Sequence, residues 1–249
     1  MTSIPNKRRW ICDRWLVGAS LAVVIALCWG WIASMALDMY GPMTGSSAWM
    51  MTRSWDLTHQ ALLFAMWAVM MIGMMLPSAA PAIFHYNSVA RKNAEDESVL
   101  ARVVAFVAGY LVVWIIFSSI ATALQLELTK ASLLSPMMEL RSRWFGGGLV
   151  LMAGMYQFTP WKRKCLEYCR SPVDHAGAFR SGVRNGISCL GCCWALMSLI
   201  FVGGVMNLWW LSVLTIFVVL EKLTLYSSQG TRLSGVLLIT AGVWILCCG

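Results

Sequence analysis

Charged residues are scarce in this chain: only 12% of its 249 residues are Asp, Glu, Lys or Arg, while 59% are hydrophobic. A soluble globular domain usually carries about 25% charged residues, so this composition favours a protein that folds in lipid. The apolar stretches are continuous rather than alternating, which argues against a membrane β-barrel. Histidine is also rare, with three residues in all, which is too few for a two-haem or multi-histidine copper enzyme.

Familiar enzyme signatures are missing as well. The chain has no Walker loop, no nucleophile elbow and no dinucleotide-binding glycine motif. Enzymatic activity stays open, but the sequence favours its absence and offers no catalytic residue. The formal net charge of +8 would suggest nucleic acid as a partner of a soluble protein. Because cytoplasmic loops of membrane proteins carry excess Lys and Arg, we expect no nucleic-acid partner here.

Apolar segments long enough to cross a bilayer recur along the chain. A span needs about 20 residues, and the pattern predicts an all-α, polytopic transmembrane helical bundle with about six or seven spans in one domain. The predicted spans are 15–37, 61–84, 103–124, 144–158, 188–206, 208–225 and 233–247. We interpret the first span as a retained anchor, because it is longer than the core of a signal peptide.

Positive charge is distributed unevenly between the predicted loops. The N-terminal segment 1–14 is basic, and so is the longest predicted loop, 161–187. A cytoplasmic N-terminus places both segments, and most of the other Lys and Arg residues, on the same side. The positive-inside rule therefore predicts this orientation, with the lipid bilayer surrounding a multi-pass protein.

Two prolines, Pro77 and Pro81, lie inside the second predicted span. Proline cannot donate a backbone hydrogen bond, so the carbonyls of Gly73 and Pro77 lose their helical partners. We expect a kink or an unwound segment at this position. A bilayer tolerates such a segment only against protein, water or a ligand.

Five of the nine cysteines cluster and form the strongest candidate site. Cys165 and Cys169 lie four residues apart in the predicted basic loop, and Cys189, Cys192 and Cys193 open the predicted fifth span. On a helix the last three share about 100° of arc and hence one face. A helix N-terminus and a basic loop would both favour their thiolate forms, and soft thiolates select copper(I), zinc or iron–sulfur clusters.

The cysteine cluster has three interpretations. The first is a metal site at the inner face of the membrane. The second is inert packing, because buried cysteines behave as small hydrophobic residues. The third is a redox dithiol formed by Cys189 and Cys192, which have the oxidoreductase spacing.

Histidines and methionines supply further candidate ligands. His85 and His175 are predicted to lie at the same membrane depth as the cysteines. Met66, Met70 and Met74 recur every four residues and form one stripe on the second span. Thioethers suit copper(I), although methionine is also a common gap-filler in cores. Copper is therefore the metal that we expect first, with zinc as the alternative.

Two ionisable residues, Glu221 and Lys222, lie inside the predicted span 208–225. Such residues are costly in a membrane and are usually functional or paired. They point about 100° apart on a helix, so they need not pair with each other. Lys222 has a simple alternative, which is to extend to the membrane interface. For Glu221 we expect a role as a proton carrier, a neighbour of the metal site or the partner of an arginine.

Several segments resemble blocks of one bacterial family: Met70–Pro77 followed by Pro81, Gly186–Met197, Val202–Asn207 and Leu220–Lys222. The family is that of uncharacterised, predicted metal-binding integral membrane proteins. The resemblance extends from about residue 61 to residue 240. It implies a protein of the bacterial inner membrane and singles out the same cysteines, but it implies no substrate or reaction.

These patterns lead to one main functional hypothesis. We predict an integral membrane protein that binds metal, copper(I) above all, as a transporter or a membrane metallochaperone. One alternative is an accessory subunit that packs against partner subunits of a larger membrane complex. The other is a thiol redox membrane protein.

Overall fold

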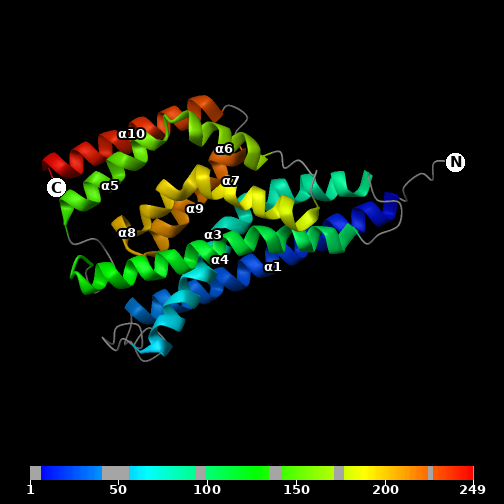
Figure 1. Ribbon diagram of the computed structural model, residues 1–249, viewed down its shortest axis with the longest axis horizontal. Coiled ribbons are helices and arrows are strands. Elements are labelled where there is room, and N and C mark those ends of the chain that lie inside the picture. The colour runs from blue at the N-terminus through cyan, green and yellow to red at the C-terminus, as the bar shows by residue number, and fades with distance from the viewer. Residues whose placement is uncertain are drawn as a thin grey trace.

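The protein is described by a computed structural model that covers residues 7–40, 56–92, 99–134, 142–170, 177–223 and 227–248. These residues are almost entirely helical (Figure 1), which confirms the predicted all-α fold. The helices are α1 (Lys7–Tyr40), α3 (Leu57–Lys92), α4 (Val99–Lys130), α5 (Arg143–Tyr156), α6 (Pro160–Arg170), α7 (Ala178–Ser198), α8 (Ile200–Gly203), α9 (Leu208–Leu223) and α10 (Ser227–Cys248).

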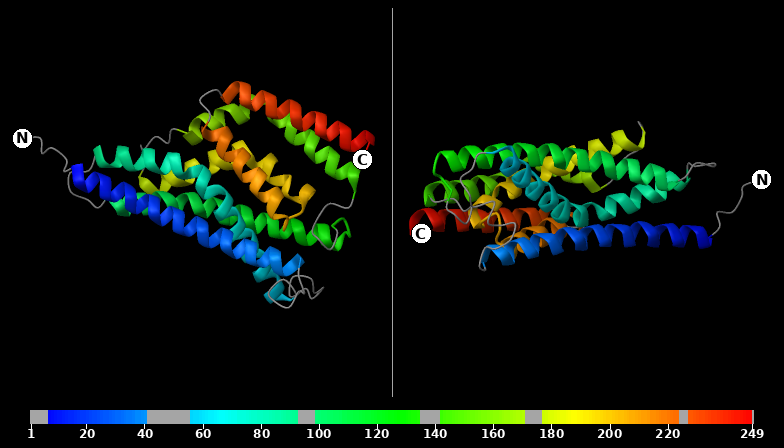
Figure 2. Two further views of the ribbon diagram at one scale, coloured as in Figure 1. Left: turned by 180° about the vertical axis from the view of Figure 1, so that it is seen from behind. Right: turned by 90° about the horizontal axis from the view of Figure 1, so that it is seen from below.

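Five helical segments are long and apolar enough to cross a membrane. They are Arg14–Met39, Leu57–Arg91, Val99–Lys130, Ala178–Gly203 and Gly230–Cys248. Helices α5 and α9 have only 14 and 16 residues, fewer than the roughly 20 that span a bilayer core. The prediction of six or seven spans is therefore too high for the described residues. The two short apolar helices pack beside the long ones, α5 along α10 and α9 against α3 (Figures 1 and 2).

The prediction that residues 161–187 form a loop is wrong for most of this segment. Helix α6 and the first turns of α7 occupy it, and only residues 171–176 lie outside the described part of the chain. Helix α6 is amphipathic: Lys162, Leu166 and Cys169 are buried on one face, at the spacing of a helical stripe. Of the basic residues that suggested a loop, Arg163 and Lys164 lie on its exposed face.

The contact between α4 and α7 is unusually close because glycines face each other across it. A Cβ atom on Gly109 would collide with the backbone of Phe179 and Val183, and one on Gly182 would collide with the carbonyl of Phe106. Small residues allow membrane helices to approach to backbone contact. This contact fixes the face of α7 that points into the bundle, and that face carries its cysteines.

Helix α3 stays helical through Pro77 and Pro81 but changes direction along its length (Figures 1 and 2). The predicted kink is present, whereas an unwound segment is not. The carbonyl of Gly73, which Pro77 leaves without its helical donor, accepts a hydrogen bond from the Trp29 indole of α1 at 3.1 Å. The fold thus satisfies the freed carbonyl with protein, as the bilayer environment requires.

Candidate functional site

Four buried thiols lie where α6 packs against α7. Cys189, Cys192 and Cys193 are 0%, 2% and 1% exposed, and Cys169 is 3% exposed. The three cysteines of α7 therefore share the buried face that their spacing predicts. Cys165 lies one turn before Cys169 on α6 and is only partly buried, with its sulfur against Gly191 of α7.

The electrostatic environment of these thiols differs from the predicted one. Helix α7 begins at Ala178, about three turns before Cys189. The helix dipole acts mainly within the first turn, so the helix N-terminus does not reach the cysteines. The positive charge beside them comes instead from Lys222 of α9.

Lys222 points into the bundle and donates hydrogen bonds to the sulfur of Cys189 at 2.9 Å and to the hydroxyl of Ser78 at 2.8 Å. Its side chain is buried, so the expectation that it extends to the membrane interface is wrong. Tyr110 of α4 adds a third polar group, with its hydroxyl 3.1 Å from the same sulfur. That hydroxyl also donates to the carbonyl of Met75 at 3.2 Å. Cys189 is thus the point where α3, α4, α7 and α9 meet.

The thiols also hydrogen-bond with one another and with the backbone. Cys192 and Cys193 donate to the carbonyl of Cys189 at 3.1 and 2.9 Å. Cys169 hydrogen-bonds with the thiols of Cys189 and Cys192, and these bonds, together with burial, raise its pKa well above the usual value. Burial likewise raises the pKa of Cys165. Both cysteines of α6 are therefore neutral thiols at physiological pH.

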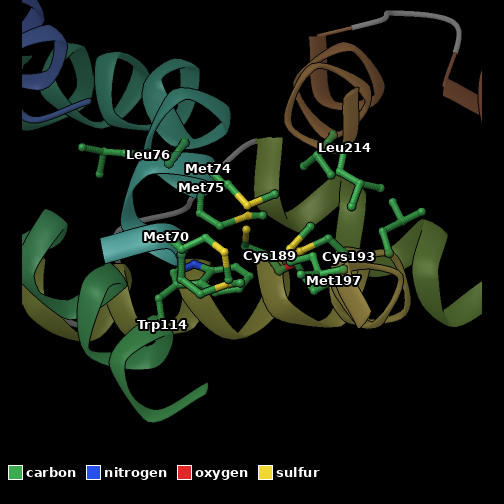
Figure 3. Close-up of a cluster of buried hydrophobic side chains, with 14 of the residues drawn as sticks. Met70, Met74, Met75, Leu76, Trp114, Cys189, Cys193, Met197 and Leu214 are labelled. Atoms are coloured by element: carbon green, nitrogen blue, oxygen red, sulfur yellow. The ribbon is translucent and has the colours of Figure 1, made fainter. Parts of the chain in front are cut away.

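Methionine side chains of α3 lie next to the cysteines of α7. Figure 3 shows the side chains of Met70, Met74 and Met75 reaching toward Cys189, with Cys193 and Met197 of α7 beside them. The predicted stripe residues Met66, Met70 and Met74 are all buried, at 2%, 1% and 0% exposure. Sequence reasoning left Met75 outside this stripe, yet it too lies against the thiols. The arrangement is a sulfur-rich core formed by helices α3, α6 and α7.

The two histidines predicted as ligands differ in what the structure says of them. His85 is exposed on α3, whereas the thiols are buried, and His175 lies outside the described residues. In the part of the chain that the structure describes, no three His, Cys, Asp or Glu side chains are arranged so that they could hold a metal ion. The thiols are hydrogen-bonded neighbours rather than a preformed cage.

Glu221 pairs with Lys162 of α6 at 2.8 Å. The Lys162 side chain is fully buried and also hydrogen-bonds with Gln157. Arg170 donates to the backbone carbonyl of Glu221 at 2.6 Å, so a lysine and an arginine of α6 both contact this residue. Glu221 and Lys222 do not pair with each other, as their helical spacing predicts. This ion pair attaches α6, and with it Cys169, to α9.

Comparison with known proteins gives one result. A family model described as PpoB2, copper chaperone, matches residues 64–245. The match begins in α3 and ends in α10, so it contains the methionine stripe, the five clustered cysteines and Lys222. It covers nearly the same part of the chain as the family resemblance seen in the sequence. No curated protein and no solved structure matches the chain.

Proposed function

The chain belongs to the PpoB2 family of copper chaperones, and we propose that it is a membrane metallochaperone that takes copper(I) into its helical bundle as cargo and transfers it to a partner protein. The single observation that carries this proposal is the meeting of α7 thiols, an α6 thiol and α3 thioethers around Cys189. Thiolate and thioether sulfurs are the ligands that select copper(I) over harder ions. Burial adds to this selectivity, since it excludes water and strongly hydrated cations.

The hydrogen bonds among the thiols are consistent with a site that forms as copper enters. Metal ligands have to be deprotonated, and metal binding releases their protons. Cys192 and Cys193 would release the Cys189 carbonyl, and Cys169 would lose its S–H proton. Lys222 assists at Cys189, because an ammonium 2.9 Å from the sulfur stabilises negative charge there. A chaperone has to give up its cargo, and a site without a rigid cage suits that requirement.

The two cysteines of α6 suggest how copper reaches the core. Cys165 is the more exposed of the two, and Cys169 lies one turn further along the same helix and in contact with Cys189 and Cys192. We assign Cys165 as the first thiol to receive copper(I) and Cys169 as the next. Stepwise replacement of one sulfur by the next keeps the ion bound throughout, so free copper is never released inside the protein.

The five long apolar helices support a role in a membrane. The uneven distribution of basic residues supports a cytoplasmic N-terminus, and the family resemblance supports the bacterial inner membrane. Within copper handling, the family match favours a chaperone over a transporter. The recipient would be a copper-requiring partner protein at the same membrane, which agrees with the exposed apolar side chains on α1, α4 and α10.

The test is the copper content of the full-length protein, purified in detergent and loaded with copper(I) under anaerobic, reducing conditions. We expect the wild type to retain near-stoichiometric copper and a Cys189→Ser/Cys192→Ser variant to lose it. The matched control is Cys247→Ser/Cys248→Ser, which removes two exposed thiols at the end of α10 and should leave the copper content unchanged. Equal copper in all three folded proteins would refute the proposal.

A further inference from the structure

A long apolar groove opens on the outside of the bundle, next to the sulfur core but separate from it. Its volume is about 1040 Å³, and helices α4, α6 and α7 form its walls and floor. The walls are mainly aliphatic and aromatic: Phe117, Ile120, Trp161, Ile187, Leu190 and Trp194. Drug-sized binding sites reach about 1,000 Å³, so the groove is large enough for an extended hydrocarbon chain.

One end of the groove is strongly basic. Arg180 and Arg184 lie one turn apart near the start of α7, and both line the groove. Arg184 stacks over the ring of Tyr168, 4.9 Å from its centroid, and donates to the Tyr168 hydroxyl at 3.1 Å. Tyr168 thereby holds this guanidinium at the rim. No acidic side chain lines the described groove, and the first turn of α7 contains none.

The dimensions of the groove match one leaflet of a bilayer. Arg184 and Trp194 lie about 15 Å apart along α7, at 1.5 Å per residue. The hydrocarbon core of a membrane is about 30 Å thick, so the apolar part of the groove extends over about half of it. Helix α7 belongs to one of the five segments able to span a membrane, which puts the groove in contact with lipid along its length.

From these observations we propose that the groove binds one anionic phospholipid, with its acyl chains along α4 and α7 and its phosphate at Arg180 and Arg184. Guanidinium groups form paired, charge-assisted hydrogen bonds with phosphate oxygens. Basic pockets between membrane helices are known to select anionic head groups. The apolar walls distinguish this ligand from free phosphate, which would find polar partners only at one end.

The position of Cys165 in the same groove gives the bound lipid a further consequence. Cys165 lines the groove and is only partly buried, so acyl chains lying there cover its thiol. Lipid binding therefore shields Cys165, the most exposed of the five clustered cysteines, from water-soluble reagents. This consequence holds whether or not the protein carries copper, and it supplies a second measurable signal.

The test uses the full-length protein in detergent micelles, titrated with phosphatidylglycerol or with phosphatidylcholine of the same acyl chains and observed by native mass spectrometry. We expect phosphatidylglycerol to bind about tenfold more tightly and to slow alkylation of Cys165. In an Arg180→Gln/Arg184→Gln variant, the preference for phosphatidylglycerol and the protection of Cys165 from alkylation both disappear. Excess inorganic phosphate does not displace the lipid from the wild type.

Two further variants separate the groove from general effects of charge and folding. Arg163→Gln/Lys164→Gln removes the same charge from the exposed face of α6, outside the groove, and keeps the preference. Ile187→Trp narrows the groove while both arginines remain, and it weakens binding of either lipid. Equal affinity of the wild type for the two lipids would overturn the proposal. An equal loss of the preference for phosphatidylglycerol in Arg163→Gln/Lys164→Gln would overturn it too. Displacement of the lipid by inorganic phosphate would do the same.

Discussion

The ammonium of Lys222 lies 2.9 Å from the sulfur of Cys189 in the interior of the bundle. The adjacent carboxylate, Glu221, pairs with Lys162 of α6. The charge of Lys222 is therefore placed against a sulfur and the Ser78 hydroxyl rather than against a carboxylate. Such an arrangement favours the form of cysteine that binds metal, because a nearby cation stabilises a thiolate.

Replacing Lys222 by methionine tests this relationship. A Lys222→Met variant keeps the length of the side chain but removes the cation, so Cys189 has to become a thiolate without its help. We expect copper(I) to bind about tenfold more weakly at neutral pH, since the thiolate loses the cation that stabilises its charge. The measurement is a competition titration with a copper(I) chelator. Lys130→Met, which breaks an exposed ion pair on α4, is the control. Tighter binding in Lys222→Met would mean that the lysine competes with copper instead.

The order in which the thiols react provides a second prediction. Cys247 and Cys248 are exposed, Cys165 is partly buried and Cys169 is buried. Alkylation of the metal-free protein by iodoacetamide should follow this order at neutral pH, because reaction requires both access and the thiolate form. Hydrogen bonds with Cys189 and Cys192, together with burial, raise the pKa of Cys169 well above its usual value, so its alkylation rate should still be rising in the alkaline range. Mass spectrometry of digested samples gives the rate at each site. Early labelling of Cys169 at neutral pH would contradict the structure.

The sequence predicted the helical membrane class and the shared face of Cys189, Cys192 and Cys193, because both depend on local periodicity. It could not predict the contact between Lys222 and Cys189, since that contact joins residues far apart in the chain through the packing of α9 against α3 and α7. Helix α6 was missed for a related reason, since its basic residues are typical of a loop unless their distant partners are known. From the sequence alone, its buried cation Lys162 looks like an exposed charge of a loop, because the partner Glu221 lies far along the chain.

The buried pair of Lys162 and Glu221 should matter for stability more than any surface pair. A Lys162→Met variant leaves the Glu221 carboxylate buried opposite an apolar side chain, and breaking such a pair typically costs about 3–5 kcal/mol. The double variant Lys162→Met/Glu221→Gln removes the unpaired buried carboxylate as well and should recover most of the lost free energy of unfolding. Thermal unfolding of four purified proteins, namely the wild type, Lys162→Met, Glu221→Gln and the double variant, completes a double-mutant cycle and measures the coupling. Additive effects of the two substitutions would argue against a direct interaction.

The contact between α4 and α7 at Gly182 should be equally sensitive to substitution. In a Gly182→Ala variant the new Cβ atom would collide with the Phe106 carbonyl, and because that carbonyl belongs to a helix backbone the two helices have to separate. Overpacking of this kind costs about 1–3 kcal/mol, and it displaces the helix that carries Cys189, so copper retention should fall together with stability. Gly148→Ala is the control: its Cβ meets nothing within 4 Å, and alanine favours a helix by up to about 1 kcal/mol over glycine. Thermal unfolding and copper content of the two variants, measured side by side, test the packing. If Gly182→Ala were as stable as the wild type, the two helices could not lie in backbone contact, and the position of the sulfur core would have to be revised.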